Sequence, residues 1–592
     1  MTVNSPLLGI EKSISGQRWE LREGNERESL ALCQRFSLPD IVGRILSARG
    51  IGLDQAEDFL NPSLKTLLPD PSHLVDMDKA INHLVGEIQS GNRIAVFGDY
   101  DVDGATSSAV LKRYFNMLGL DMGVYIPDRM SEGYGPNLPA LMKLKEQGYS
   151  TVITVDCGIT AFDVLGKASK SGLNMVVMDH HAAEAHLPDA IAVVNPNRLD
   201  DASPHGHMAA VGVVFLLVVG LNRALRDVGF FGDKKEPDIR LLLDLVALGT
   251  VCDVVPLKGV NRAFVSQGLK VMAGRRNTGM KALADVSAVD GPPSAYHLGF
   301  QMGPRVNAGG RVGEAALGSR LLASDTPQEA LAIARQLDGF NAERKEIEAA
   351  CLEQAIEMVE REGREKDSLI YVASEGWHAG VIGIVASRLK ERYGAPACVV
   401  AIENGVGKGS GRSVDGVDLG AHVIAAHQSD LLLNGGGHKM AAGFTVTEAL
   451  SDEFRDYLNE RISKQVSEME MVPTLTVDGC LQASGATIDL VKTLDQLAPF
   501  GAGNATPKFV LENVKIIKPR IVGADHVSCQ VSSSGGGNWI KAIAFRCADQ
   551  NLGDLLLSAN HGLPVHLAGR LQIDSWQGRD SVQIMIEDAA PA

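Results

Sequence analysis

The chain places carboxylates and imidazoles directly after apolar segments that should be buried. The run from Met175 to Met178 is followed at once by Asp179-His180-His181. A polar turn at the end of a strand would explain a lone D-H-H string. Delivery of ligands to a metal ion is the alternative, because neutral imidazole and carboxylate oxygen both bind transition metals.

Three further segments end in the same way. RIAVFG leads into Asp99-Tyr100-Asp101-Val102-Asp103-Gly104, TVITV leads into Asp156-Cys157-Gly158, and LLLDLVALGTVC leads into Asp253. Taken alone, D-x-D-x-D-G also fits a turn or a calcium loop, although the closing glutamate of such a loop is missing near residue 110. A lone Asp156 or Asp253 is more simply a cap or turn residue. Because strand ends in a parallel sheet converge on one crevice, the four segments together predict a shared site.

Crowded carboxylates of this kind need a compensating charge. Asp101 and Asp103 are two residues apart, so an extended segment would point both to one side. Burial and mutual repulsion would raise their pKa values, and divalent cations would convert the repulsion into coordination. Mixed oxygen and imidazole donors suit Mn²⁺ better than Ca²⁺ or a thiolate zinc site. Two such cations lower the pKa of water and stabilise the oxygens of a phosphoryl displacement, which indicates phosphoester hydrolysis.

The elements that position these residues follow from the pattern of the chain. From Arg93, short runs rich in β-branched residues alternate with helix-like segments, which predicts an α/β domain with a parallel sheet. Residues 327–366 predict one long helix, or two in tandem with a join near Gly339. Segments 367–374 and 395–403 predict strands of a second α/β unit, with a helix over 381–394 between them. After Pro473, short alternating stretches separated by turns predict a β-barrel of the OB type.

Composition and charge limit the classes of protein. The 592 residues allow about four domains, and 45% hydrophobic with 22% charged residues is typical of a globular protein. A net charge of −16 argues against a simple basic coat for polyanions, but a local groove can still bind nucleic acid. The stretch from Lys258 to Lys281 is basic and free of acids, including Arg262, Lys270, Arg275 and Arg276. It is either a solvated helix face or a lining that follows a nucleic-acid backbone.

The sequence also predicts where the protein resides. No apolar run approaches the length that spans a bilayer, and the first residues lack the pattern of a secretion signal, so we expect no membrane association. Eight dispersed cysteines form no C-x-x-C pair. A reducing cytoplasm is the expected location.

The motifs together resemble a known group of enzymes. D-Y-D-V-D-G, V-D-C-G, D-H-H and C-D-V-V-P-L occur in this order and resemble the four motifs of the DHH phosphoesterase superfamily. Within it, the chain looks like the RecJ family of bacterial exonucleases specific for single-stranded DNA. The resemblance continues through GPRVNAGGR, EGWHAGVIGIVASRL, GSGRS and NGGGHKMAAG, and covers nearly everything from residue 80 onward.

The resemblance implies a fold of the α/β class. A parallel-sheet DHH domain is joined by a long helix to a second α/β domain, called DHHA1, and an OB-type β-barrel follows. The implied division is an N-terminal lead-in (1–80), a DHH catalytic domain (81–320), a connecting helix (321–366), a DHHA1 substrate-binding domain (367–465) and an OB-fold nucleic-acid-binding domain (470–592).

The resemblance also assigns roles at the strand ends. It implies that two Mn²⁺ or Mg²⁺ ions are held by Asp99, Asp101, Asp103, Asp156, His180 and Asp253. Asp156 would bridge the two ions, and Asp99 would be either a ligand or a hydrogen-bond acceptor for one. His181 would contact the scissile phosphate or assist proton transfer, so that Asp156 and His181 are the catalytic pair. Asp179 would orient the neighbouring histidine, and Cys157 would be a small buried neighbour.

Substrate contacts are expected from other motifs. G-S-G-R-S (409–413) and N-G-G-G-H (434–438) are each compatible with a tight turn or with a close approach to phosphate. The resemblance favours binding of the 5′-terminal phosphate by Ser410 and Arg412. The other expected substrate-binding residues are Arg129, Arg305, Asn307 and His438. In the barrel, Phe509, Trp539, Phe545 and Trp576 are either base-stacking surfaces or core.

The implied function is that of a metal-dependent 5′-to-3′ exonuclease. It would degrade single-stranded DNA to 5′-mononucleotides in DNA repair and recombination, with a single-strand-binding protein and a helicase as partners. One alternative is a phosphodiesterase or phosphatase acting on short oligonucleotides, pAp or cyclic dinucleotides, which the barrel and the long connector disfavour. A non-catalytic nucleic-acid-binding protein is the other, which the intact ligand positions disfavour.

Overall fold

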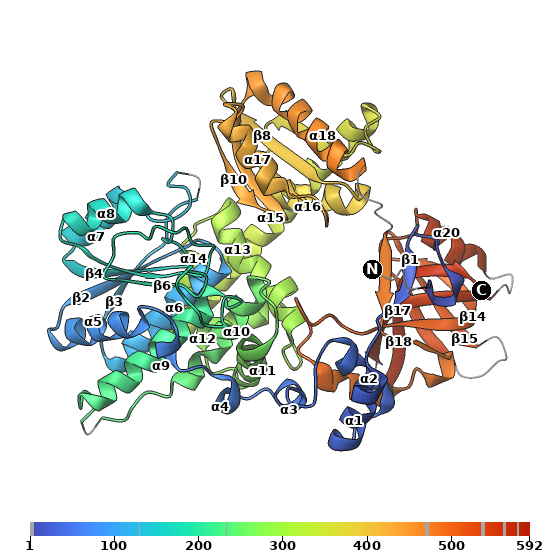
Figure 1. Ribbon diagram of the computed structural model, residues 1–592, viewed down its shortest axis with the longest axis horizontal. Coiled ribbons are helices and arrows are strands. Elements are labelled where there is room, and N and C mark those ends of the chain that lie inside the picture. The colour runs from blue at the N-terminus through green and yellow to red at the C-terminus, as the bar shows by residue number, and fades with distance from the viewer. Residues whose placement is uncertain are drawn as a thin grey trace.

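The computed structural model describes residues 5–129, 131–232, 234–467, 473–533, 539–559, 564–576 and 579–592. Figure 1 shows three bodies: a first α/β domain in blue to green, a second in yellow and orange, and a β-barrel in red. The second α/β domain lies above the other two in this view. No helix in the described ranges is long and apolar enough to cross a membrane.

The first α/β domain contains the predicted parallel sheet, and its strand order is β3-β2-β4-β5-β6. In β2, Ile94 and Val96 face one core, whereas Ala95 and Phe97 face the other. This alternation buries both faces of the sheet, as expected for parallel strands covered by helices. The strands are β2 (Arg93–Gly98), β3 (Met122–Tyr125), β4 (Tyr149–Val155), β5 (Asn174–Met178) and β6 (Ala192–Val194).

Helices cover both faces of this sheet. One core is formed with α5 (Met77–Gln89), α6 (Val102–Leu118) and α9 (Ala210–Asp227), and the other with α7 (Leu138–Glu146) and α8 (Phe162–Lys170). Three more helices, α10 (Leu243–Cys252), α11 (Gly259–Ala273) and α13 (Gly303–Val312), complete the side that carries the C-D-V-V-P-L and GPRVNAGGR motifs.

The connector is one uninterrupted helix, α15 (Pro327–Arg361), and it passes Gly339 without a break. Its first half contributes Ile333 and Leu337 to the core of the first domain. Its second half contributes Ala355 and Val359 to the core of the second. The helix therefore fixes the two domains to each other through packing at both ends.

The second α/β domain has a mixed sheet with strand order β10-β11-β9-β8-β7. Its strands are β7 (Ile370–Glu375), β8 (Ala397–Glu403), β9 (Val406–Arg412), β10 (Asn434–His438) and β11 (Ala441–Thr447), and its helices include α16 (Ile382–Tyr393), α17 (Leu419–Gln428) and α18 (Ser451–Ser467). The predicted strands and the helix that ends at Gly394 are confirmed.

The glycine-rich motifs of this domain are strands, so the tight-turn alternative is wrong for both. Residues 409–412 belong to β9, which pairs with β8 on one side and β11 on the other. The backbone of this segment is used by the sheet and offers no cradle of free N–H groups. Residues 434–438 form the edge strand β10, in which Gly437 has φ +155° and leaves no room for a Cβ against Ala441.

The predicted barrel is confirmed. Among the described residues, five strands close a ring in the order β14-β15-β16-β18-β17, and β17 pairs back onto β14. They are β14 (Lys508–Val522), β15 (His526–Ser533), β16 (Ile540–Ala544), β17 (Val565–Trp576) and β18 (Arg579–Pro591). Closure removes unpaired edges, which is how small all-β domains avoid aggregation.

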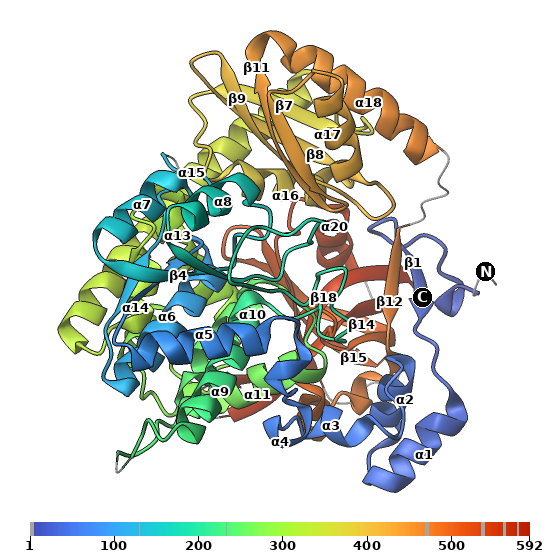
Figure 2. The same cartoon turned by 60° about the vertical axis from the view of Figure 1, so that its left-hand side comes forward.

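The N-terminal lead-in packs against the barrel. Strand β1 (Arg18–Leu21) pairs in parallel with β12 (Thr474–Val477), and helices α1 (Glu26–Phe36) and α2 (Asp40–Ala48) share a core with barrel residues. Trp19 is fully buried and donates its indole N–H to Asp588 at 2.8 Å. Figures 1 and 2 both show this blue segment beside the red barrel, so residues far apart in sequence form one body.

Candidate metal centre

Three aspartates lie one residue beyond the ends of strands in the first domain. Their backbone N–H groups continue the hydrogen bonding of the sheet. Asp99 donates its backbone N–H to Val155, and Asp156 donates to Met178. Asp179 donates in the same way to Val194. Each carboxylate is thus fixed at the carboxyl edge of the sheet, where ligand sites of α/β proteins form. Asp156 adopts φ +60°, a left-handed conformation that aspartate tolerates better than most residues.

Asp101 and Asp103 lie at the start of a helix, so the predicted extended segment is wrong there. Asp101 is the N-cap of α6, and its Oδ1 accepts hydrogen bonds from the backbone of Asp103 at 2.8 Å and of Gly104 at 3.1 Å. Capping competes successfully with an extended conformation because it satisfies otherwise unpaired N–H groups. Gly104 is required here, since a Cβ would lie 2.4 Å from the carbonyl oxygen of Asp99.

The buried Asp103 carboxylate also accepts from a second helix. Its Oδ2 is 2.6 Å from the backbone nitrogen of Ala210 and its Oδ1 is 2.9 Å from that of Val211. These N–H groups belong to the first turn of α9, where the helix dipole favours a negative charge. Asp103 therefore joins residues 99–103, which we call the acidic loop, to α9.

His180 lies at the centre of the cluster, between acids from three segments. Its Nε2 is 3.3 Å from Oδ1 of Asp156 and 3.9 Å from Oδ2 of Asp103. Its Nδ1 is 3.7 Å from Oδ2 of Asp253, the residue that caps the C-terminus of α10. The sequence expectation that these four segments converge is confirmed, although Asp253 follows a helix and not a strand.

Several buried atoms of the cluster lack hydrogen-bond partners among the described residues. They are Oδ1 of Asp99, Nε2 of His180 and Oδ2 of Asp253. A buried polar atom without a partner costs about 1–3 kcal/mol, so such atoms are rarely left unexplained. Carboxylate oxygens and an imidazole nitrogen are the donors that Mn²⁺ accepts, so these residues fit a divalent cation.

Three overlapping groups of residues have ligand atoms within 4.8 Å of one another. One group is Asp156, His180 and His181, another is Asp103, His180 and Asp253, and a third is Asp99, Asp101 and Asp156. Asp156 and His180 each occur in two groups. All six residues that the sequence nominated as metal ligands are therefore brought together.

Several carboxyl groups of the cluster have raised pKa values, as expected where acids are buried together with too little positive charge. Burial, and then the carboxylate of Asp101, raises the pKa of Asp99 to about 8. Burial and then Asp103 raise the pKa of Asp253 to about 9, and burial raises that of Asp156 well above its usual value. Burial lowers the pKa of His180 to about 4, so its ring is neutral and able to bind a metal at neutral pH.

His181 is held by Asp179 instead of by the acids of the cluster. Its Nδ1 is 2.8 Å from Oδ1 of Asp179, whose other oxygen accepts from the backbone of Ile159 at 3.0 Å. Burial acts to raise the pKa of Asp179, but the hydrogen bond with His181 keeps it below the usual value. The pairing predicted from the sequence, with Asp179 orienting a histidine, is present, and the histidine is His181.

Other residues support the histidines, and the sequence motifs did not indicate them. The hydroxyl of Tyr134 donates to the backbone oxygen of Asp156 at 3.1 Å and lies 3.5 Å from Nδ1 of His181. The amides of Asn195 and Asn197 donate to the carbonyls of His181 and His180, at 2.9 and 2.5 Å. The polar N-P-N string directly after β6 was the signal available in the sequence. Cys157 is fully buried, as expected.

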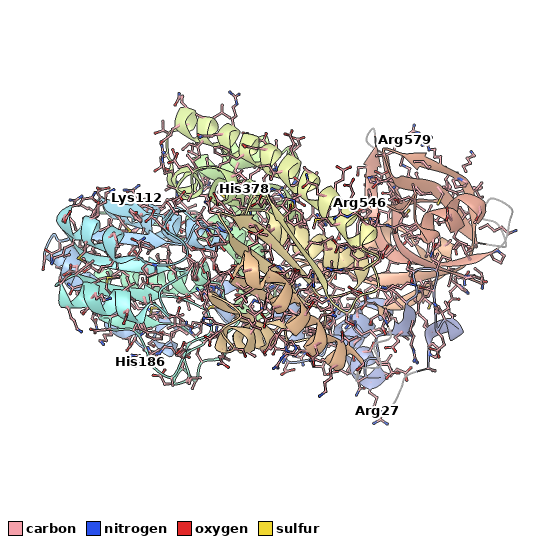
Figure 3. The ribbon with its side chains drawn as sticks, turned by 90° about the horizontal axis from the view of Figure 1, so that it is seen from above. Arg27, Lys112, His186, His378, Arg546 and Arg579 are labelled. Atoms are coloured by element: carbon pink, nitrogen blue, oxygen red, sulfur yellow. The ribbon has the colours of Figure 1, made fainter. Side chains whose placement is uncertain are left out.

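The GPRVNAGGR segment connects the cluster to the second α/β domain. A Cβ on Gly310 would lie 2.9 Å from the carbonyl oxygen of Tyr100, so glycine allows α13 to approach the acidic loop. Arg311 donates to the carbonyl of Gly380 at 2.9 Å. Figure 3 labels His378, two residues before Gly380, near the centre of the molecule. Arg305 is paired with Asp338 of α15 at 2.8 Å, and Asn307 lies half-buried on α13.

Ser410 and Arg412 point to the same face of β9, where α16 begins. The Nη1 of Arg412 donates to Oγ of Ser410 at 3.1 Å. A Cβ on Gly383, in the first turn of α16, would lie 3.0 Å from both side chains. His438 is exposed and occupies the same row of the sheet as Arg412, with Ala441 between them. Arg129 lies over the Tyr100 ring, beside the acidic loop.

Among the aromatic residues of the barrel and the basic residues of 258–281, some side chains are buried and others are exposed. Phe509 is fully buried in the barrel core, whereas Trp539 and Phe545 are about half exposed. The side chain of Trp576 lies outside the described residues. In the basic stretch, Arg262 is 1% exposed and is neither solvated nor a lining residue, whereas Lys258, Lys270, Arg275, Arg276 and Lys281 are exposed.

Family models match three parts of the chain. "DHH family, N-terminal domain" matches residues 93–250, "DHHA1 domain" matches residues 366–464 and "RecJ OB domain" matches residues 477–588. The parallel sheet, its acidic and histidine cluster and these matches define the class, which is that of the DHH proteins with a DHHA1 domain and an OB barrel.

Similarity to individual proteins identifies the family within this class. The chain is 35% identical to the single-stranded-DNA-specific exonuclease RecJ of Salmonella typhimurium, over 96% of this chain and 98% of that one. It is 33% identical to RecJ of Bacillus subtilis, over 97% and 71%. The crystal structure of RecJ with Mn²⁺ from Thermus thermophilus matches with a TM-score of 0.81 at 29% identity, covering 97% of this chain and 79% of that one. The chain belongs to the RecJ family.

Proposed function

We propose that the protein is a metal-dependent exonuclease that degrades single-stranded DNA from its 5′ end to 5′-mononucleotides, in DNA repair and recombination. One observation carries the proposal. Buried atoms of Asp99, His180 and Asp253 that have no hydrogen-bond partner in the described part of the chain meet at the carboxyl end of the parallel sheet, beside Asp156. Relatives that match nearly the whole chain are named for exonuclease action on single-stranded DNA, which supports the same activity.

The cofactor is Mn²⁺ or Mg²⁺, and we propose two ions. Structures of the Thermus thermophilus relative were solved with each of these cations. Asp99, Asp101, Asp103, Asp156, His180 and Asp253 would hold the ions, with Asp156 shared between them, as it is shared between two of the ligand groups. When bound, such cations lower the pKa of water and offset the charge that develops at phosphorus.

The chain itself orients the reacting phosphate. Asp179 holds one ring nitrogen of His181 and leaves the other for the substrate. The side chain of His181 is 47% exposed, in contrast to 13% for His180, so it is the histidine that a phosphate can reach. We assign His181 to hydrogen bonding with the scissile phosphate. Tyr134, which contacts both Asp156 and His181, would keep this ring in place.

The 5′ polarity would come from Ser410 and Arg412. Their side chains meet at the N-terminus of α16, where N–H groups and the helix dipole favour an anion. Arg412 can grip a phosphate through two N–H groups. Arg129 and Arg311 are close enough for their charges to influence Arg412 and each other. Arg129 and Arg311 extend the positive electrostatic potential from Arg412 toward Asp101. His438 lies at the edge of the sheet face that carries Arg412.

The DNA strand would leave the metal centre through a cleft between the first domain and the barrel. This cleft has a volume of about 800 Å³. Val254, next to Asp253, and the stacked exposed rings of Tyr296 and Phe300 line one wall. Phe500 and Arg570 line the other. Aromatic surfaces stack on bases of any sequence, which suits a nuclease without sequence preference.

The domains, the remaining substrate contacts, the partners and the location are assigned in keeping with this function. We propose residues 81–320 as the catalytic domain, 321–366 as the connecting helix, 367–465 as the phosphate-binding domain and 470–592 as the strand-holding barrel, with 1–80 as a lead-in. Arg305 and Asn307 would contact the substrate from α13, which also contacts the second α/β domain through Arg311. A helicase and a single-strand-binding protein, which produce and coat single strands, are the proposed partners, and the cytoplasm is the proposed location.

Digestion of defined DNA tests this function directly. We expect a long 5′-phosphorylated single strand labelled at its 5′ end to release labelled mononucleotide first in the presence of Mn²⁺, while a blunt duplex resists. Asp156→Asn should abolish the reaction and serves as the control for contaminating nucleases. Cleavage confined to dinucleotides, pAp or cyclic dinucleotides would support the phosphodiesterase alternative instead. Strand binding without any hydrolysis would support a non-catalytic protein.

A further inference from the structure

Arg262 of α11 connects three separate segments of the chain. Its Nε donates to the carbonyl of Phe59 at 2.8 Å, and its Nη2 donates to Leu497 at 3.0 Å and to Ala498 at 2.7 Å. Nη1 donates to Pro499 at 3.3 Å, and the guanidinium lies 3.8 Å from the centre of the Phe59 ring. Burial lowers the pKa of Arg262 to about 10, so it remains charged at neutral pH.

These contacts are unusual for a buried charge. Every hydrogen-bond acceptor that the structure describes for Arg262 is a backbone carbonyl, and none is a carboxylate. Burying a guanidinium is costly unless its donors are satisfied, so the site must supply carbonyls at fixed positions. Only the planar five-donor head of arginine can reach these carbonyls together, which lysine cannot reproduce. Arg262 therefore locks the positions of two other segments against α11.

The segment on the barrel side, residues 497–505, is also held by a buried side chain of its own. Asn504 is 2% exposed, and its amide donates to the same carbonyls of Leu497 and Pro499, at 2.9 and 2.8 Å. Arg49 of the N-terminal lead-in donates to the Oδ1 of Asn504. We call residues 497–505, with Arg262 and Asn504 as their anchors, the interdomain latch.

The latch packs directly against the segment that follows the metal ligand Asp253. The backbone N–H of Leu257 donates to Ala502 at 2.8 Å. A Cβ on Gly503 would lie 2.9 Å from Pro256, so the contact is close. The latch also contributes to the wall of the 800 Å³ cleft that faces Val254. The distance between the two walls of the cleft thus depends on the latch.

We propose that Arg262 is a positioning residue that holds the barrel in register with the metal centre, and so makes the enzyme favour long strands over short ones. This inference rests on the proposed nuclease function. A strand that spans the metal centre and the barrel gains from two sites held at a fixed separation, whereas a trinucleotide occupies the metal centre alone. Loosening the latch lowers the effective concentration of the second site and leaves the metal ligands themselves unchanged.

The test compares Arg262→Met with the native full-length enzyme on long and trinucleotide 5′-phosphorylated substrates. We expect KM for the long strand to rise about tenfold or more, since avidity is lost when the geometry of two linked sites is lost. For the trinucleotide, kcat and KM should stay within about twofold, because the metal ligands are unchanged. Arg262→Lys should recover part of the long-strand affinity. Arg44→Met, which removes an exposed charge from α2, is the matched control and should leave both substrates unaffected.

A second variant keeps the test decisive if Arg262→Met does not fold. Asn504→Ala removes the other anchor of the same carbonyls and should produce the same selective rise in KM. Combined with Arg262→Lys, its effect should be less than additive, since both act on one segment. Equal losses on long and short substrates, or no change on either, would overturn the inference. A native enzyme that degrades no DNA would instead refute the proposed function.

Discussion

Asp156 and His180 come from the ends of neighbouring strands, and the Oδ1 of Asp156 lies 3.3 Å from the Nε2 of His180. Asp156 is buried, and the buried Nε2 has no hydrogen-bond partner among the residues that the structure describes. This pair is the centre of the cluster, because each residue also belongs to a second group of potential ligands.

Metal binding should release protons. With pKa values of about 8 and 9, Asp99 and Asp253 are largely protonated at pH 7 in the metal-free protein, and they must ionise to bind a cation. Lowering the pH from 8 to 6 should therefore weaken Mn²⁺ binding, and raising it should strengthen binding. Calorimetric titration of the native protein in two buffers of different ionisation enthalpy measures the protons released. Binding enthalpies that are identical in the two buffers would show that no proton leaves.

Asp179→Asn should reduce turnover while preserving metal binding. The substitution removes the charge that holds His181, but it leaves the ligand carboxylates in place. Loss of such a supporting group costs about 10–100-fold in activity. His181→Ala should cost as much, and the double variant should be little worse than either single one. Additive losses would mean that the two residues act independently.

Arg412→Ala should remove the preference for a 5′-phosphate over a 5′-hydroxyl. A charge-assisted hydrogen bond contributes about 1.5–3 kcal/mol, which corresponds to roughly 10–100-fold in kcat/KM. Activity on 5′-hydroxyl strands should change little. Arg392→Ala, an exposed arginine of α16 that pairs with Glu360, is the control. If Arg412→Ala weakens both substrates equally, the arginine does not read the terminal phosphate.

Trp19→Ala should destabilise the barrel. The ring is fully buried against Val477 and Val510, and truncation of a buried aromatic residue costs about 3–5 kcal/mol. Trp19→Phe keeps most of the packing, and loses mainly the hydrogen bond to Asp588, so its cost should be smaller. Urea unfolding followed by circular dichroism measures the difference. An unchanged midpoint for Trp19→Ala would show that the N-terminal strand is not needed for the stability of the barrel.

Much of the catalytic sheet could be predicted from the sequence because its signals are local. Each strand is a short apolar run, and the change to Asp99, Asp156 or Asp179 marks its end. The parallel order then forces these ends together. The sequence motifs did not show the local conformation of Asp101 and Asp103. Asp101 as the N-cap of α6 and an extended Asp101–Asp103 segment fit the same residue pattern, and only the structure distinguishes them.

Other features depend on contacts between distant residues. The glycine-rich strand β9 has little intrinsic preference for a strand, but the Phe444 ring occupies the space that a Cβ on Gly409 would need. The docking of residues 18–48 on the barrel and the role of Arg262 rest on partners hundreds of residues away. Tyr134 lies in a loop with other polar residues such as Glu132 and Asn137, and nothing in the sequence singles it out as a support for His181.

The proposed chemistry requires that the acids and His180 hold a pair of divalent cations. Anomalous diffraction from crystals of the native protein soaked in Mn²⁺ tests it most directly. We predict two peaks, with Asp156 in contact with both, and loss of at least one peak in Asp156→Asn. A single peak away from Asp156, or none at the carboxyl end of the sheet, would contradict the account.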